Sequence, residues 1–197
     1  MHRSAFALIV VAGASTAALA QFTNRDFETG DLTGWNIANT PNGTASVQNV
    51  EQWDIDGPGP LGTNFAANFS VGNAIAPNQG PQGIELTQML MLDGGQTYVF
   101  EFDWSATRTS TTTNSEGGIF ELIVDGTSLA SQNAGSTNNS TPHYGHVVAT
   151  YTAPTTGLYS VGARITRQFT IPGVGGGETL FQHVDNFLPS GSTPTCE

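Results

Sequence analysis

The sequence predicts an all-β protein, an antiparallel β-sandwich made of two sheets. Two observations in the 197-residue chain predict it. Apolar and polar residues alternate with a period of two along many short segments, and the 3.6-residue period of an amphipathic helix is nearly absent. Turn-forming residues separate these segments, since the chain contains 24 glycines and 10 prolines. About nine short strands with turns at fairly regular spacing are typical of a sandwich.

The chain opens with a predicted secretory signal peptide, residues 1–20. His2 and Arg3 precede an apolar stretch, and residues 18–20 (ALA) fit the small-x-small pattern that signal peptidase recognises. The apolar stretch is short for a membrane span, and no later segment is apolar enough to cross a bilayer. We therefore expect a mature chain that begins at Gln21 and is secreted or held at the cell surface, in an extracellular or periplasmic location.

The predicted strands follow one another along the rest of the chain. The clearest is 96–106, in which Tyr98, Phe100, Phe102 and Trp104 share one face. The same alternation runs through the segments that follow, and Asp-Gly pairs at 93–94 and 125–126 predict tight turns between neighbours. The nine predicted strands are 22–28, 44–50, 64–71, 84–92, 96–106, 119–124, 146–152, 158–166 and 180–187.

Length and charge restrict the domain count and the partners. Residues 21–189 suit one β-sandwich domain, and 190–197 read as a flexible Ser/Thr/Pro tail or the start of a linker. The chain has no lysine, and the expected mature chain has four arginines against sixteen Asp and Glu, a formal charge of −12. This charge excludes nucleic acid and disfavours anionic membranes. Neutral glycans, cations and basic proteins remain open as partners, as does a role in solubility alone.

The chain contains a single cysteine, Cys196, so an intrachain disulfide is excluded. A lone exported thiol could form an intermolecular disulfide, and a frayed tail is the alternative. The core must therefore stabilise the domain without disulfides, with or without the help of a metal ion.

Four motifs resemble the galactose-binding-like jelly rolls, which include carbohydrate-binding modules attached to bacterial polysaccharide-degrading enzymes. Residues 24–35 (NRDFETGDLTGW) resemble their opening motif, and residues 184–187 (VDNF) resemble their closing motif. Residues 86–98 and 151–157 resemble an internal strand pair and a turn of the same family. The resemblance implies a jelly-roll topology, with Phe27 and Trp35 in the core, but no particular ligand.

The resemblance also implies a structural calcium ion where the first and last strands meet. Its carboxylate ligands would be Glu28 and Asp185, with oxygens from Asp26 and from the 54–63 loop completing the shell. Calcium binds six to eight hard oxygen ligands, which irregular loops can supply. The alternative is that Glu28 and Asp185 are ordinary solvated carboxylates.

The resemblance further implies sugar binding on a sheet face or at the rim of the sandwich. Such a site needs aromatic rings that stack on sugars and planar polar groups that bind hydroxyls. The candidates in this sequence are Trp53, Glu101, Asp103, Arg108, Tyr144 and Arg164, with His146 and Gln182 as further polar groups. Each has a structural alternative; Arg164, for example, could simply form an ion pair with Glu101 or Asp103 across the sheet instead of contacting a ligand.

Motifs of common enzyme classes are absent from the sequence. It has no HExxH and no GxSxG, and the Gly-rich segment 172–177 lacks the Lys of a phosphate loop. We therefore expect a non-catalytic protein, and the resemblance implies that it binds an extracellular glycan. The alternative is a structural or adhesive protein of the cell surface or matrix, which uses the same sandwich without sugar binding.

Overall fold

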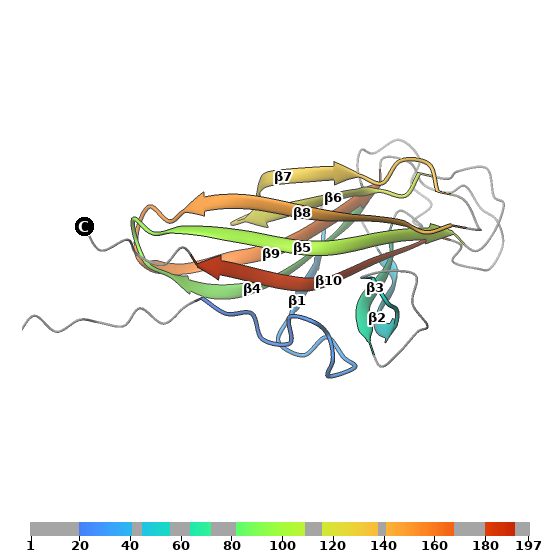
Figure 1. The fold of residues 1–197 in the computed structure, drawn as a ribbon, viewed down its shortest axis with the longest axis horizontal. Helices are drawn as coiled ribbons and strands as arrows, with labels where there is room; N and C mark the ends of the chain where they lie inside the picture. Colours follow the sequence, from blue (N-terminus) through green and yellow to red (C-terminus); the bar gives the residue numbers. More distant parts are fainter. Residues whose placement is uncertain are drawn as a thin grey trace, which may run out of the picture.

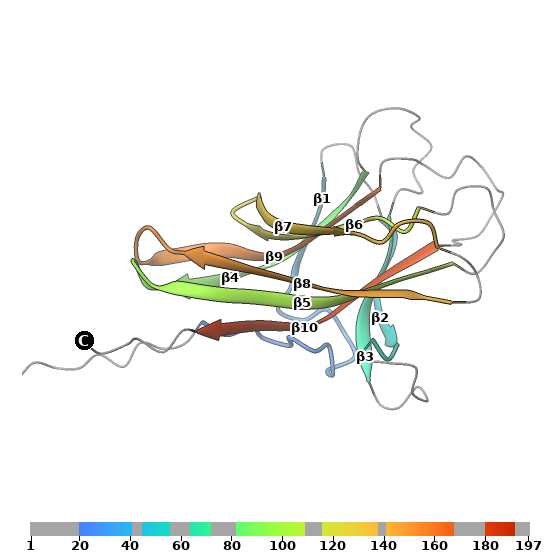
Figure 2. The same ribbon diagram turned by 45° about the horizontal axis from the view of Figure 1, so that its top comes forward.

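The computed structural model describes residues 20–40, 45–55, 64–71, 82–108, 116–137, 141–167 and 180–191. These residues contain ten strands, all paired antiparallel, and no helix. Sheet A has the order β1-β4-β9-β6-β7 and sheet B the order β2-β3-β10-β5-β8. The two sheets lie one above the other as a sandwich with jelly-roll topology (Figures 1 and 2). The strands are β1 (Asn36–Asn39), β2 (Ala45–Gln52), β3 (Phe65–Val71), β4 (Gln82–Leu92), β5 (Thr97–Arg108), β6 (Ile119–Val124), β7 (Thr127–Asn133), β8 (His143–Thr152), β9 (Gly157–Arg167) and β10 (Leu180–Gly191).

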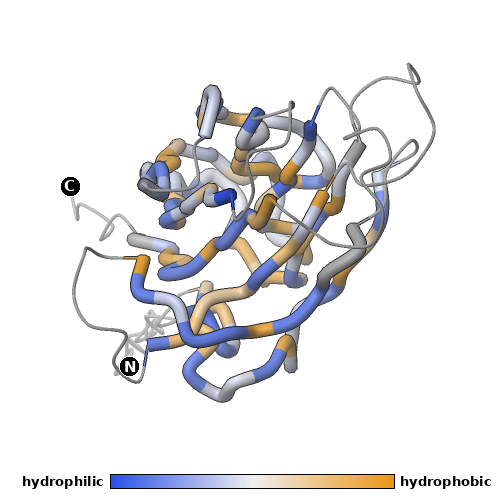
Figure 3. The backbone as a smooth tube through the Cα atoms, turned by 90° about the vertical axis from the view of Figure 1, so that its right-hand side faces the viewer, coloured by the Kyte–Doolittle hydropathy of each residue, from blue (hydrophilic) through white to orange (hydrophobic). Residues whose placement is uncertain are grey.

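The alternation along each strand decides which side chains enter the core. On β5, the side chains of Tyr98, Phe100, Phe102 and Trp104 are buried. The residues that alternate with them, Val99, Glu101 and Asp103, point to the outer face of sheet B and stay partly exposed. Figure 3 shows the resulting change between hydrophobic and hydrophilic residues along the strands. The predicted shared face of residues 98–104 is therefore confirmed as core.

Eight of the nine predicted strands are confirmed, and the prediction of a strand at 22–28 is wrong. Residues 23–26 and 28–30 form turns, in which Asn24 and Phe27 have positive φ angles of 49° and 53°. A bulky residue with positive φ is rare, so surrounding contacts must impose this conformation. Among those contacts, Trp35 Nε1 donates to the Asn24 carbonyl at 2.9 Å.

The N-terminal turns close one edge of the sandwich between the two sheets. Thr23 and the Gln88 side chain on β4 exchange two hydrogen bonds, of 2.9 Å and 2.6 Å. On the sheet B side, the Phe187 amide of β10 donates to the Arg25 carbonyl at 3.0 Å. In Figure 1 this segment, coloured blue, runs beneath β4 and β10. A short stretch of turns therefore ties both sheets together without a disulfide.

Phe187 lies at the centre of an aromatic cluster at this edge. Its ring centroid lies 4.5 Å from that of Trp35, 5.1 Å from Phe102, 5.6 Å from Phe22 and 6.2 Å from Phe27. Phe27 is fully buried and Trp35 is 9% exposed, so both predicted core positions are confirmed.

A β-bulge in β10 brings Phe187 into this cluster. Asp185 pairs with Asp103 and Leu188 with Glu101, so Asn186 and Phe187 together oppose Phe102. Asn186 has a φ of 54°, and its side chain turns to the outer face, where it contacts Asp103. The bulge thus places two consecutive residues, Asp185 and Asn186, on the outer face before Phe187 returns to the core.

Several predictions concern segments outside the described residues. These are the signal peptide up to residue 19, most of the 54–63 loop, the Gly-rich segment 172–177 and the tail that contains Cys196. Nowhere in the described part of the chain does a helix occur that is long and apolar enough to cross a membrane.

Candidate functional site

Four of the six predicted ligand-binding residues come together on the outer face of sheet B. Glu101 and Asp103 point outward from β5, Tyr144 lies on β8, and Trp53 follows β2. Arg108 ends β5 opposite the buried Leu180 and has the parity of Trp104, so it does not belong to this outer face. The sixth residue, Arg164, lies on β9 of sheet A.

His183 lies at the centre of the outer face of sheet B and is fully buried. Its Nε2 lies 2.7 Å from Glu51 Oε1, and its Nδ1 lies 3.1 Å from Ser105 Oγ. Burial lowers the pKa of His183 below its ordinary value of 6.5, although the hydrogen bond and the charge of Glu51 act in the opposite direction. In the neutral ring Nε2–H donates to the carboxylate, so Nδ1 accepts from the Ser105 hydroxyl.

The segment after β2 covers His183 from outside. The Trp53 ring stacks on the imidazole at 4.1 Å with an interplanar angle of 3°. Ile55 is buried although it lies outside the hydrophobic core cluster, as does the outward-pointing Ala66 of β3. Residues 53–55 therefore form a wall across this half of the outer face. Asp54 of this segment acts on β8: burial, and after it the charge of Asp54, raises the pKa of Tyr144.

The other half of the outer face is an open strip on β5 and β8. His146 bridges two acids there: its Nδ1 lies 2.7 Å from Asp103 Oδ1 and its Nε2 lies 3.4 Å from Glu101 Oε2. Asn186 donates to the second oxygen of Asp103 at 3.0 Å. Both oxygens of Asp103 are thus engaged, whereas Oε1 of Glu101 has no partner among the described residues.

Apolar side chains lie between these polar groups. Tyr144 and Val148 on β8 are 43% and 49% exposed, and they flank His146 along the strand. Leu188 on β10 lies next to Glu101 on its other side. The strip from Tyr144 to Val148 therefore offers an exposed ring, an aliphatic surface and hydrogen-bonding groups side by side on β5 and β8.

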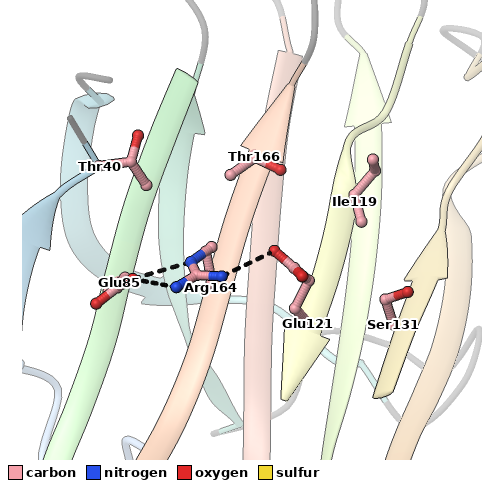
Figure 4. Close-up of a pocket in the computed structure, with 7 residues that line it drawn as sticks. All are labelled: Thr40, Glu85, Ile119, Glu121, Ser131, Arg164 and Thr166. Carbon is pink, nitrogen blue, oxygen red and sulfur yellow. Dashed lines mark hydrogen bonds and ion pairs between the residues drawn. The ribbon is translucent and has the colours of Figure 1, made fainter. Parts of the chain in front are cut away.

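Arg164 lies on the opposite outer face, so the predicted alternative that it pairs with Glu101 or Asp103 is wrong. Its Nε and Nη2 donate to Glu85 Oε1 at 2.9 and 2.7 Å, and its Nη1 lies 3.6 Å from Glu121 Oε2. β9 pairs with β4 and β6, which carry these two acids. Figure 4 shows the guanidinium between the two carboxylates, in a pocket that Thr40, Ile119, Ser131 and Thr166 also line.

The predicted calcium ligands lie where the N-terminal turns meet β3 and β10. Glu28 Oε1 accepts from the Phe65 amide at 3.0 Å, and Asp26 Oδ1 accepts from the Glu28 amide at 3.5 Å. Asp185 is buried on β10, and its Oδ1 accepts from the Asn186 amide at 2.7 Å. Within the described residues, no group of three or more His, Cys, Asp or Glu side chains could hold a metal ion. An ion at this corner would therefore depend on carbonyl oxygens beside Glu28 and Asp185, a donor set that suits calcium.

Other predictions fall inside the sandwich. Gln182 is buried on the core side of β10, where its Oε1 accepts from the Val71 amide at 3.0 Å. Trp104 is confirmed as core, stacked on Phe120 with centroids 4.5 Å apart. His183, Glu51 and Asn186 were not among the predicted site residues. The outward parity of His183, two residues before Asp185, is the only sequence signal for the first of them.

Solved structures of low sequence identity share the fold. TmCBM61, solved in complex with β-1,4-galactotriose, is similar with a TM-score of 0.50 and 15% identity, over 89% of this chain and 100% of that chain. Two further similar structures are Family 16 Carbohydrate Binding Module-2 (TM-score 0.48, 16% identity, 86% and 98% covered) and the K1 cleaved adhesin domain of Lys-gingipain from Porphyromonas gingivalis W83 (0.49, 11%, 85% and 96%). No protein-family model and no curated protein matches the chain. The likeness to TmCBM61, together with the two five-stranded sheets, supports a β-sandwich fold of the carbohydrate-binding-module type.

Proposed function

We propose that the protein is a non-catalytic module that binds a neutral glycan on the outer face of sheet B, outside the cytoplasm, after removal of the signal peptide. The single observation that carries this proposal is the open strip of β8 and β5. There the exposed Tyr144 ring lies beside the carboxylates of Glu101 and Asp103. The ring can stack on the apolar face of a pyranose, while carboxylate and amide oxygens accept its hydroxyl protons.

The charge of the outer face favours neutral over acidic sugars. Glu51, Asp54, Glu101 and Asp103 lie on it or border it. His146, its exposed basic group, already contacts two of these acids. A uronic acid or sulfate would meet these carboxylates, while His146 is already engaged with two of them and the described residues of this face supply no other cation. Hydroxyl groups, by contrast, supply the donors that these oxygens need.

The geometry of the acids also supports a non-catalytic role. Glycoside hydrolysis needs two carboxylates on either side of the scissile bond. Glu101 and Asp103 instead lie side by side on one strand, and His146 connects them. This arrangement suits hydrogen bonding to a sugar better than proton transfer across one.

Affinity electrophoresis through immobilised polysaccharides tests the proposal. We expect retardation by a neutral glycan, with β-1,4-galactan, xylan and β-glucans in the panel, and none by a polyuronate or a sulfated glycan. Tyr144→Ala should weaken binding about tenfold, which equals about 1.4 kcal/mol, whereas Tyr144→Phe keeps the ring and should bind nearly as wild type. A blank result with all neutral glycans, or equal binding by Tyr144→Ala, contradicts it.

We also propose a structural calcium ion held by Glu28, Asp185 and neighbouring carbonyl oxygens. The support is that Glu28 accepts from the Phe65 amide of β3 and that the Arg25 carbonyl accepts from the Phe187 amide of β10, the strand that carries Asp185. When bound, the ion would clip the N-terminal turns to the last strand. Thermal melts with calcium and with a chelator test it. Free calcium at about a hundred times the Kd of the site adds about 2.7 kcal/mol to the free energy of unfolding, so the melting midpoint should rise. A midpoint that is the same with calcium and with chelator would count against the ion.

A further inference from the structure

The outer face of sheet A carries a hollow, on the side of the sandwich away from the Tyr144 strip. Its volume is about 490 Å3, which lies in the range of small-molecule sites. The lining residues come from β4, β9, β6 and β7 and from Thr40, which directly follows β1 (Figure 4). The whole width of sheet A therefore contributes to one pocket.

Arg164 lies at the centre of this pocket, and hydrogen bonds fix the position of its side chain. Its guanidinium donates to Glu85 Oε1 and, at 2.7 Å, to the Gly126 carbonyl in the β6–β7 turn. Glu121 faces it from the other side at 3.6 Å. Hydrogen bonds thus hold Nε and Nη2, Nη1 faces a second carboxylate, and the side chain is only 22% exposed.

The hydrogen-bonding capacity of the pocket is not used up by these contacts. Among the described residues, Glu85 Oε2 and Glu121 Oε1 have no hydrogen-bond partner, and neither do the hydroxyls of Ser131 and Thr166. Ile119 adds an apolar surface between them. Carboxylate acceptors, hydroxyl groups and one aliphatic side chain around a central arginine match the alternating hydroxyl and C–H surface of a pyranose.

The charge of the pocket narrows the ligand class. Two carboxylates against one arginine leave a formal charge of −1, so an anionic ligand would be repelled. Arg164 already donates to a carboxylate, which leaves little of its charge for a phosphate or a uronate. A neutral polyhydroxylated ring satisfies the free oxygens without adding charge.

We propose that this pocket is a second sugar site, which binds one neutral pyranose residue, and that the module holds two glycan chains on its opposite faces. The second part rests on the proposed function of sheet B. The two outer faces point away from each other across two sheets packed about 10 Å apart. One flat glycan cannot reach both, so double occupancy joins two separate chains.

Amide and arginine side-chain NMR spectra, recorded while D-galactose, D-glucose, D-xylose and D-mannose are added one at a time, test the pocket. We expect at least one of these sugars to shift the Arg164 Nε–H signal and amides around Glu121. Glu121→Gln should weaken the affinity measured from those shifts at least tenfold and leave the shifts near Tyr144 unchanged. Glu101→Gln removes the same charge from the other face and should do the reverse, so each variant is the matched control of the other.

The outcomes separate the two proposals. Shifts confined to sheet B overturn the pocket and leave the proposed function standing. Shifts confined to the pocket support it and remove the site on sheet B. No shift with any of the four sugars overturns the pocket. With a polymeric glycan that binds, wild type should raise light scattering through cross-linking while Glu121→Gln binds without it; equal scattering overturns the two-chain model.

Discussion

Replacing His183 by Gln should remove a large part of the pH dependence of stability between neutral and mildly acidic pH. Burial lowers the pKa of His183 in the folded protein, so the ring stays neutral there below its ordinary value of 6.5. In the unfolded chain the ring binds a proton as the pH falls through 6.5. The unfolded state is then favoured, and the free energy of unfolding decreases from pH 6.5 downward to the folded pKa.

The size of the effect follows from one proton. Between the two pKa values the free energy of unfolding falls by up to about 1.4 kcal/mol per pH unit. Urea unfolding at about pH 7.5, 6.5 and 5.5 measures this slope, and m should stay constant. The Gln side chain can still donate to Glu51 but loses the Ser105 bond and the Trp53 stack, so we expect His183→Gln to be about 1–3 kcal/mol less stable at neutral pH.

His146→Gln is the matched control, because it removes an exposed histidine from the same outer face. Its pH slope should keep the contribution of His183. If His183→Gln shows the same slope as wild type, the buried ring is not the group that titrates, and the reasoning fails.

Two further substitutions test the packing. Phe187→Ala should lower the free energy of unfolding by about 3–5 kcal/mol in urea melts, because the ring contacts four other aromatic rings. Phe181→Ala, on the partly exposed side of β10, should lower it clearly less. Equal losses of stability in the two variants would contradict the role of the cluster. Gly145→Ala should cost about 1–3 kcal/mol and change tryptophan fluorescence, because the added methyl would meet the Trp104 ring; Gly157→Ala, with no atom within 4 Å of the methyl, should be nearly neutral.

The strands could be predicted because burial between two sheets imposes the same alternation on every strand. Residues 22–28 broke the rule. Phe22 and Phe27 reach one aromatic cluster from turns, and only tertiary contacts make a positive φ at Phe27 acceptable. The edge strands β1 and β7 were missed for the opposite reason. They are short or polar, and their side chains are mostly exposed, so their sequences show little alternation of apolar and polar residues.

The candidate site was predictable within a strand but not between strands. Parity placed Glu101 and Asp103 on an outer face, and the structure agrees. Parity cannot tell which sheet a strand joins, so Arg164 was grouped with acids of the other sheet, whereas its partners are Glu85 and Glu121. The position of His183 beneath Trp53 depends on a contact between β10 and the residues that follow β2, which no local pattern encodes.

The bulge at Asn186 and Phe187 divides β10 into two halves of opposite phase. Gln182 and Val184 face the core before it, and Phe187 and Pro189 do so after it. Loss of Asn186 or Phe187 would restore a regular ladder. The strand would then lack either the residue whose positive φ reverses the alternation or the aromatic ring that fills the core. Changes in chain length here should therefore be tolerated far less than changes of side chain. Among natural variants of this sandwich, we expect the spacing of the last strand to be fixed even where its residues differ.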